Sequence, residues 1–207
     1  MKAPIWIETE ADVAAGRAVL LRLEPRFAVI EGPLPLRRRP DGFAALLHAI
    51  VGQQVSTASA AAIWARVQAA GFDDEAAVRG ADDDALRACG LSRPKIRYAR
   101  ALADARIDYG ALREAPVDHV VDTLVAVPGI GRWTAEIYVK FALGAADVFA
   151  AGDLALQEGA KLLFDLPARP AEREMRAMAE AWSPVRAIAA RALWAYYREK
   201  TKREGAL

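Results

Sequence analysis

Apolar residues recur at three- and four-residue spacings along most of the chain, which is the pattern of amphipathic helices. The sequence is rich in Ala, Leu, Arg and Glu, and short Gly- and Pro-containing breaks separate the periodic runs. The predicted fold class is therefore all-α, a compact helical bundle. We expect helices over residues 10–23, 42–51, 57–70, 73–78, 82–88, 94–105, 118–126, 132–143, 154–164, 172–180 and 184–200.

The ends of the predicted helices carry recognisable signals. Ser56 or Thr57 is expected to cap the third helix, and Ser92 the sixth. Residues 32–41 contain three prolines and three consecutive arginines, which predicts a connector. The second helix should bury one apolar face, made of Phe43, Leu46, Leu47 and Ile50.

Composition narrows the possible classes of protein. A hydrophobic share of 54% in 207 residues is ample for a buried core, in one domain or two small lobes. The single cysteine, Cys89, excludes an intrachain disulfide, a four-cysteine zinc site and a cysteine-held iron–sulfur cluster. His48 and His119 lack the spacing of metal ligands.

Charge and hydropathy do not by themselves indicate a partner. The net charge is only +1, so solvated faces explain the local basic clusters better than a nucleic-acid site does. One such cluster comprises Arg93, Lys95, Arg97 and Arg100. No apolar run approaches the roughly 18 residues of a membrane span, and residues 1–10 do not resemble a secretory signal. We therefore expect a cytoplasmic protein.

A Pro-Gly-Ile-Gly turn between two predicted helices is the first candidate for chemistry. Pro128 cannot continue the preceding helix, while Gly129 and Gly131 tolerate positive φ. The following helix would begin with free backbone N–H groups, which form an anion site that suits a DNA phosphate. A plain tight turn is the alternative, and for an isolated Gly-x-Gly it is the commoner one.

The longer run from Leu124 to Ala135 resembles the hairpin of the helix-hairpin-helix DNA glycosylase superfamily. Residues 40–56 and the run Trp182-Ser183-Pro184-Val185-Arg186 are similar to its alkylpurine branch, the 3-methyladenine DNA glycosylase II family. The likeness extends from about Leu21 to Tyr197, in a reduced form without the N-terminal β-rich domain of larger members. It implies two lobes, residues 43–135 and residues 1–42 with 136–207, with the active-site cleft between them.

The resemblance also implies how the hairpin binds DNA. The groups assigned to the phosphate backbone are Pro128, Gly129, Ile130, Gly131, Arg132 and Thr134. No cofactor is required. A structural Na⁺ or K⁺ ion is expected on the backbone carbonyls of Val125, Val127 and Ile130.

Asp153 is the candidate catalytic residue. From the pattern alone it is a helix N-cap, because Gly-Asp precedes an apolar-periodic run. The resemblance places the catalytic aspartate at the same position, and a carboxylate there would stabilise the positive charge that forms on the sugar as its bond to the base breaks. Asp147, Glu158 and Asp165 are rivals that do not match the family position.

Trp133 stands where strand-cleaving relatives carry a Schiff-base lysine, so the resemblance implies base removal without strand cleavage. Trp133 and Trp194 match aromatic positions of the base pocket, and Ile137 replaces a further aromatic residue. Both tryptophans are equally compatible with ordinary core packing. Indole rings would favour cationic bases.

Gln54, with Gln53 beside it, matches the wedge that fills the gap left by a flipped nucleotide, although a loop glutamine that caps the next helix is the simpler interpretation. The function expected is a monofunctional glycosylase that excises alkylated purines from double-stranded DNA as a monomer, with no membrane role. Two alternatives stay open: a non-catalytic helix-hairpin-helix module, and a glycosylase for another base lesion.

Overall fold

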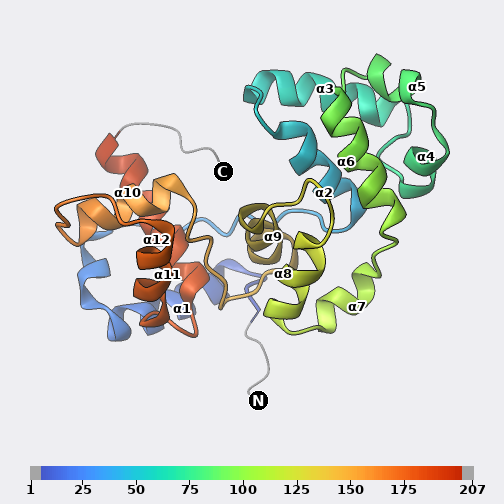
Figure 1. The fold of residues 1–207 in the computed structure, drawn as a ribbon. Coiled ribbons are helices and arrows are strands. Elements are labelled where there is room, and N and C mark those ends of the chain that lie inside the picture. Colours follow the sequence, from blue (N-terminus) through green and yellow to red (C-terminus); the bar gives the residue numbers. More distant parts are fainter. Residues whose placement is uncertain (1–5, 202–207) are drawn as a thin grey trace. The chain divides into compact units, whose positions relative to one another are not determined.

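The computed structural model describes residues 6–201, and over this range its regular structure is helical (Figure 1). It contains twelve α-helices, one 3-10 helix and one π-helical segment, and the described residues form no strand. Their one isolated β-bridge pairs Trp6 with Ala145. The predicted all-α class is confirmed. None of the described helices is long and apolar enough to cross a membrane.

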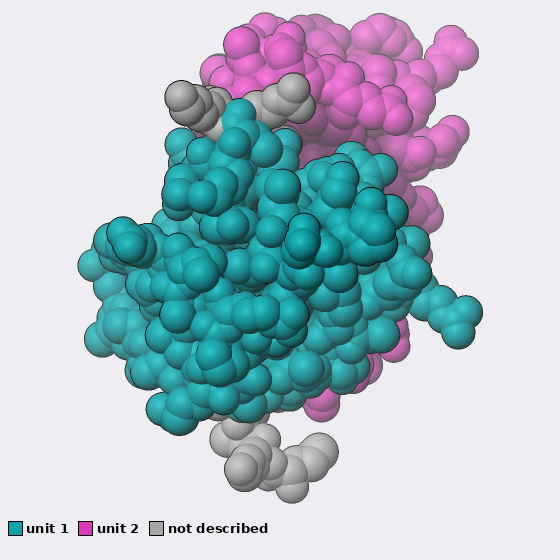
Figure 2. Space-filling view, turned by 90° about the vertical axis from the view of Figure 1, so that its left-hand side faces the viewer, with its two compact units in different colours: residues 1–38, 139–207 teal, residues 39–138 magenta. Residues whose placement is uncertain are grey.

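The chain divides into two compact units (Figure 2). Unit 1 combines residues 1–38 with residues 139–207, and unit 2 is the intervening segment, residues 39–138. The hairpin therefore belongs to unit 2, whereas Asp153 and Trp194 belong to unit 1.

Unit 1 is built around α12 (Arg186–Thr201), whose residues 187–194 are all buried. α12 packs most extensively on α10 (Leu154–Leu163), and also on α1 (Glu10–Leu23) and α11 (Glu172–Glu180). A Cβ added to Gly159 would lie 2.5 Å from the carbonyl oxygen of Leu193, so α10 can approach α12 this closely only with glycine there. The 3-10 helix η1 (Pro25–Val29) and the π-helical η2 (Val139–Leu143) complete the unit.

Unit 2 is organised around α2 (Phe43–Gly52), which packs against α3 (Thr57–Ala69), α6 (Arg93–Asp104) and α9 (Arg132–Tyr138). The apolar face predicted for α2 is buried, as expected. The remaining helices are α4 (Glu75–Gly80), α5 (Asp83–Ala88), α7 (Tyr109–Glu114) and α8 (Val117–Val125).

The predicted helix ends are largely confirmed, with instructive differences. Ser56 caps α3 by accepting the N–H of Ser59 at 3.2 Å. Ser92 occupies the N-cap of α6 but its side chain makes no capping hydrogen bond. The pattern missed α7, a six-residue helix that Asp108 caps, because so short a helix shows little periodicity. The single helix predicted over 132–143 changes from α to π at Val139.

Candidate active site

The hairpin is a tight turn between α8 and α9. Ile130 donates its N–H to the carbonyl of Val127 at 3.0 Å, and the side chains of both residues are buried. Gly129 has φ 95, and a Cβ added to it would lie 2.3 Å from the ring of Tyr98. A Cβ added to Gly131 would meet nothing within 4 Å, so the backbone is open there. The first N–H groups of α9, which have no intrahelical partner, follow directly.

Side chains from elsewhere in unit 2 hold this hairpin. The Nε2 amide of Gln53 donates to the carbonyl of Gly129 at 2.9 Å, and the Nζ of Lys95 donates to the carbonyl of Val51 at 2.7 Å. Burial lowers the pKa of Lys95. We call Gln53, Lys95 and Tyr98 the hairpin clamp. Gln53 links the end of α2 to the hairpin, and Lys95 links α6 to the end of α2. The sequence did not predict these contacts, because Lys95 was assigned to a solvated basic cluster.

Gln54 and Gln53 are placed differently, although they are adjacent in sequence. Gln54 is exposed and has φ 56, the left-handed region that residues other than glycine rarely adopt. Gln53 is half-buried, with its amide on the hairpin carbonyl. Only Gln54 is therefore presented in the manner a wedge requires, and strain of this kind is commonly kept at functional positions.

At the start of α9, some of the predicted site residues are exposed and others are buried. Trp133 is 40% exposed, while Thr134 and Ile137 are both buried. Arg132 forms an ion pair with the buried Glu136, with its Nε 3.3 Å from the carboxylate. Trp133 and Arg132 are thus the exposed side chains at the start of α9. The Thr134 side chain, expected to add a phosphate donor, is largely withdrawn from it.

In unit 1, Asp153 is the N-cap of α10. Its Oδ1 accepts the N–H groups of Ala155 at 2.9 Å and Leu156 at 3.3 Å. Its own N–H donates to Ala150 at 3.0 Å, and Gln157 donates to the carbonyl of Ala151 at 2.8 Å. Asp153 as a whole is 6% exposed. These bonds fix the carboxylate in one orientation, which suits both a helix N-cap and a catalytic carboxylate.

The rival acids are engaged differently. Asp147 accepts from the Nε of Arg186 at 2.6 Å and from the hydroxyl of Ser183 at 2.9 Å. Glu158 pairs with Arg169 at 3.4 Å, and Asp165 is an exposed residue with φ 52. Asp147 is therefore a structural ion-pair partner, whereas Asp153 accepts the main-chain N–H groups of Ala155 and Leu156.

Trp194, the second predicted pocket residue, is 5% exposed. The guanidinium carbon of Arg37 lies 3.5 Å from the centre of its ring system, and that of Arg198 lies 4.9 Å away. Its indole Nε1 is buried and has no hydrogen-bond partner among the described residues. The ring is thus already in contact with cations of its own unit.

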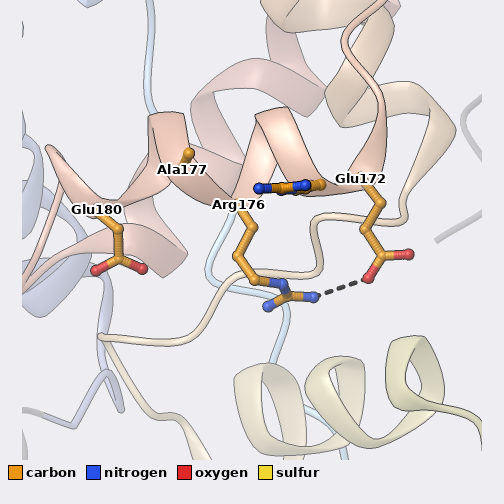
Figure 3. Close-up of a pocket in the computed structure, with 5 residues that line it drawn as sticks. Glu172, Arg176, Ala177 and Glu180 are labelled. Atoms are coloured by element: carbon orange, nitrogen blue, oxygen red, sulfur yellow. Dashed lines mark hydrogen bonds and ion pairs between the residues drawn. The ribbon is translucent and has the colours of Figure 1, made fainter.

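A surface hollow on α11 offers no alternative site. Its lining comes from that one helix: Glu172, Arg173, Arg176, Ala177 and Glu180 (Figure 3). Arg176 and Glu172 form an ion pair across one turn at 2.9 Å. Because no aromatic side chain lines it, the hollow does not suit a flipped base.

No group of three or more His, Cys, Asp or Glu side chains in residues 6–201 could hold a metal ion. The ion expected at the hairpin would have other ligands, namely neutral backbone carbonyl oxygens of one turn. These belong to Val125, Val127 and Ile130. Val127 already accepts one hydrogen bond, which leaves a second lone pair on its oxygen. Neutral carbonyl oxygens of this kind suit a monovalent cation.

Comparison with known proteins identifies the family. The model of the HhH-GPD superfamily base excision DNA repair protein matches residues 47–184, which is more than half of the chain and includes both the hairpin and Asp153. The chain belongs to the HhH-GPD superfamily. The resemblance inferred from the hairpin and its flanking segments is thereby confirmed.

Individual proteins are similar to most of the chain. DNA-3-methyladenine glycosylase 1 of Schizosaccharomyces pombe is 30% identical over 165 residues, covering 75% of this chain and 72% of that protein. The structure of a DNA-3-methyladenine glycosidase from Bacillus halodurans superposes with a TM-score of 0.80 at 30% identity, covering 96% and 94% of the two chains. The S. pombe 3-methyladenine DNA glycosylase in complex with abasic DNA gives a TM-score of 0.73 at 26% identity, covering 90% and 97%.

Proposed function

We propose that this HhH-GPD protein is a monofunctional DNA glycosylase of the 3-methyladenine type, which excises alkylated purines and leaves an abasic site. The observation that carries the proposal is Asp153, a buried carboxylate held by two main-chain N–H groups within the family match. The names of its relatives, 3-methyladenine glycosylases of yeast and bacteria, support the substrate class.

DNA binding would rest on the hairpin. The open backbone at Gly131 and the start of α9 offer N–H donors to a phosphate, and Arg132 adds an exposed positive charge. A Na⁺ or K⁺ ion on the carbonyls of Val125, Val127 and Ile130 would add charge at the same turn. The relative whose structure is in complex with abasic DNA supports DNA as the partner, which we propose to be double-stranded.

Base extrusion would use Gln54, whose exposed and strained position suits insertion into a duplex. Trp133 would then stack on the flipped base, because its indole is partly exposed. An indole face attracts a cationic base by about 0.5–2 kcal/mol.

The chemical step would be hydrolysis of the N-glycosidic bond. The Asp153 carboxylate stabilises the oxocarbenium-like sugar and orients or deprotonates the attacking water, whose oxygen bonds to the anomeric carbon as the base leaves. Trp133 has no amine to form a Schiff base, so the strand stays intact.

The test uses methylated duplex DNA, analysed with and without alkali. We expect strand breaks only after alkali, which converts abasic sites to breaks. No breaks after alkali would leave the non-catalytic DNA-binding module as the function. Breaks before alkali would contradict the monofunctional reaction.

A panel of single-lesion duplexes then defines the specificity. We expect 3-methyladenine-like bases to be released faster than an oxidised purine. The reverse order would favour a glycosylase for another lesion.

A further inference from the structure

Arg37 packs on the face of Trp194. Its guanidinium carbon is 3.5 Å from the centre of the indole ring system, which is closer than the 4.9 Å of Arg198. Arg37 has φ 48, a backbone conformation that is unfavourable for arginine. A strained residue that nevertheless makes so close a contact indicates that the surrounding structure holds it there.

The neighbouring connector is fixed to α12 by Arg191. This buried residue donates from one guanidinium nitrogen to the carbonyl of Ala187 at 3.0 Å, and from another to the carbonyl of Leu36 at 3.2 Å. Because Leu36 directly precedes Arg37, the second bond places the connector beside Trp194.

This side of unit 1 has a positive electrostatic character. Burial, together with the positive charges of Arg38 and Arg37, lowers the pKa of Arg191 to about 10, so that Arg191 remains charged at neutral pH. The Trp194 ring itself contacts two guanidinium groups, those of Arg37 and Arg198.

We propose that Arg37 is a specificity-determining residue, whose guanidinium takes the place on the Trp194 ring that a cationic base would take and so shifts excision toward neutral damaged bases. The inference rests on the proposed function, and on the resemblance that assigns Trp194 to the base pocket. The sequence led us to expect that both indoles favour cationic bases. Of the two, only Trp133 is exposed, so we now expect this preference from Trp133 alone.

The physical reason is that two cations do not share one indole face. While Arg37 stays in place, a cationic base loses the cation–π contact with Trp194, and a neutral base loses only stacking. If the base displaces Arg37, the guanidinium remains tethered nearby and repels a cationic base more than a neutral one. Either course penalises the cationic base.

The experiment compares duplexes that carry a single 7-methylguanine, a cationic base, or a single hypoxanthine, a neutral one. Arg37→Met removes the charge and retains much of the side-chain length. Arg37→Gly also removes it and suits φ 48, which guards against misfolding. In both variants we expect the ratio of kcat/KM for 7-methylguanine to that for hypoxanthine to rise by roughly 2- to 30-fold.

Arg38→Met is the matched control, because it removes one charge from the next residue without removing the contact with Trp194. We expect it to leave the ratio unchanged. An equal rise in Arg38→Met would mean that general charge, and not the ring contact, sets the preference, and would overturn the proposal.

A double variant, Arg37→Met with Trp194→Leu, lacks the indole ring as well as the guanidinium. We expect its ratio of kcat/KM values to show none of the rise expected for Arg37→Met alone. A wild type that releases both bases, with Arg37 variants that keep its ratio, would refute the role of Arg37 alone. A wild type that releases neither base would refute the proposed function and the role of Arg37 with it.

Discussion

The hairpin of unit 2 and the Asp153 region of unit 1 present their functional groups in opposite ways. At the hairpin, backbone groups would meet the ligand, and side chains of the hairpin clamp hold that backbone. At Asp153 a side chain would meet the substrate, and backbone N–H groups hold the side chain. Substitutions at the hairpin should therefore act through shape and binding, whereas substitution of Asp153 should act on the chemical step.

Asp153→Asn should give the largest effect. Asparagine is also a good N-cap and nearly isosteric, so the fold should be kept. The loss of the negative charge should lower the rate of base release by about 10²–10⁴-fold, while DNA affinity persists. Single-turnover release from a lesion-containing duplex, together with a binding titration, would measure both.

Asp147→Asn is the matched control, because it neutralises an acid of the same unit that is paired with Arg186. It should lower stability and leave the chemical step nearly unchanged. Retained turnover in Asp153→Asn would remove Asp153 from the mechanism, and a large loss in Asp147→Asn would make that residue the better candidate.

Gly131→Asp tests the hairpin through its backbone. A Cβ at this position meets no neighbour within 4 Å, so the variant should fold, with an anion placed where a phosphate is expected. We expect affinity for all DNA to fall about 10-fold at low salt, and less at high salt because charge repulsion is screened. Gly131→Ala should bind like the wild type. Equal affinity of Gly131→Asp and Gly131→Ala would reject this hairpin as the phosphate site.

The sequence predicted the turn of the hairpin and the N-cap position of Asp153 better than it predicted the groups around them. Periodicity and local capping determine where α1 and α11 begin and end, and both predicted ranges, 10–23 and 172–180, agree with the structure. The contact of Gln53 with Gly129 joins segments 76 residues apart, and no local pattern encodes it. The contact of Arg37 with Trp194 is likewise not predictable from a local pattern. The sequence of the connector shows only many arginines and prolines.

Gln53→Leu should have a moderate effect, because it removes the clamp bond and preserves side-chain bulk. A neutral hydrogen bond of this kind contributes about 0.5–1.5 kcal/mol, so base release should slow by up to roughly 10-fold. Hydrogen exchange should quicken at the N–H of Ile130, whose turn the clamp supports. Gln54→Leu alters the neighbouring side chain without removing that bond, so it should leave exchange at Ile130 unchanged. If both variants accelerate exchange equally, Gln53 has no special part in holding the hairpin.

Lys95→Met should have the smallest effect on function and a distinctive dependence on pH. Burial lowers the pKa of Lys95 below its ordinary value of 10.5, so the unfolded chain binds this proton more readily than the folded one. The contribution of Lys95 to stability therefore rises with pH between the lowered pKa and 10.5. Chemical unfolding at a series of pH values should show the wild type gaining stability relative to Lys95→Met across that window.

The variant is needed as the reference because tyrosines in unit 2 act in the opposite direction. Burial raises the pKa of Tyr138 to about 12 and raises that of Tyr109 as well, so their contribution is lost as the pH rises above the ordinary tyrosine value of 10.0. The tyrosines contribute equally to the stability of the wild type and of Lys95→Met, so their contributions cancel in the difference between the two proteins. A constant difference at all pH values would mean that burial does not lower the pKa of Lys95, which would contradict this prediction.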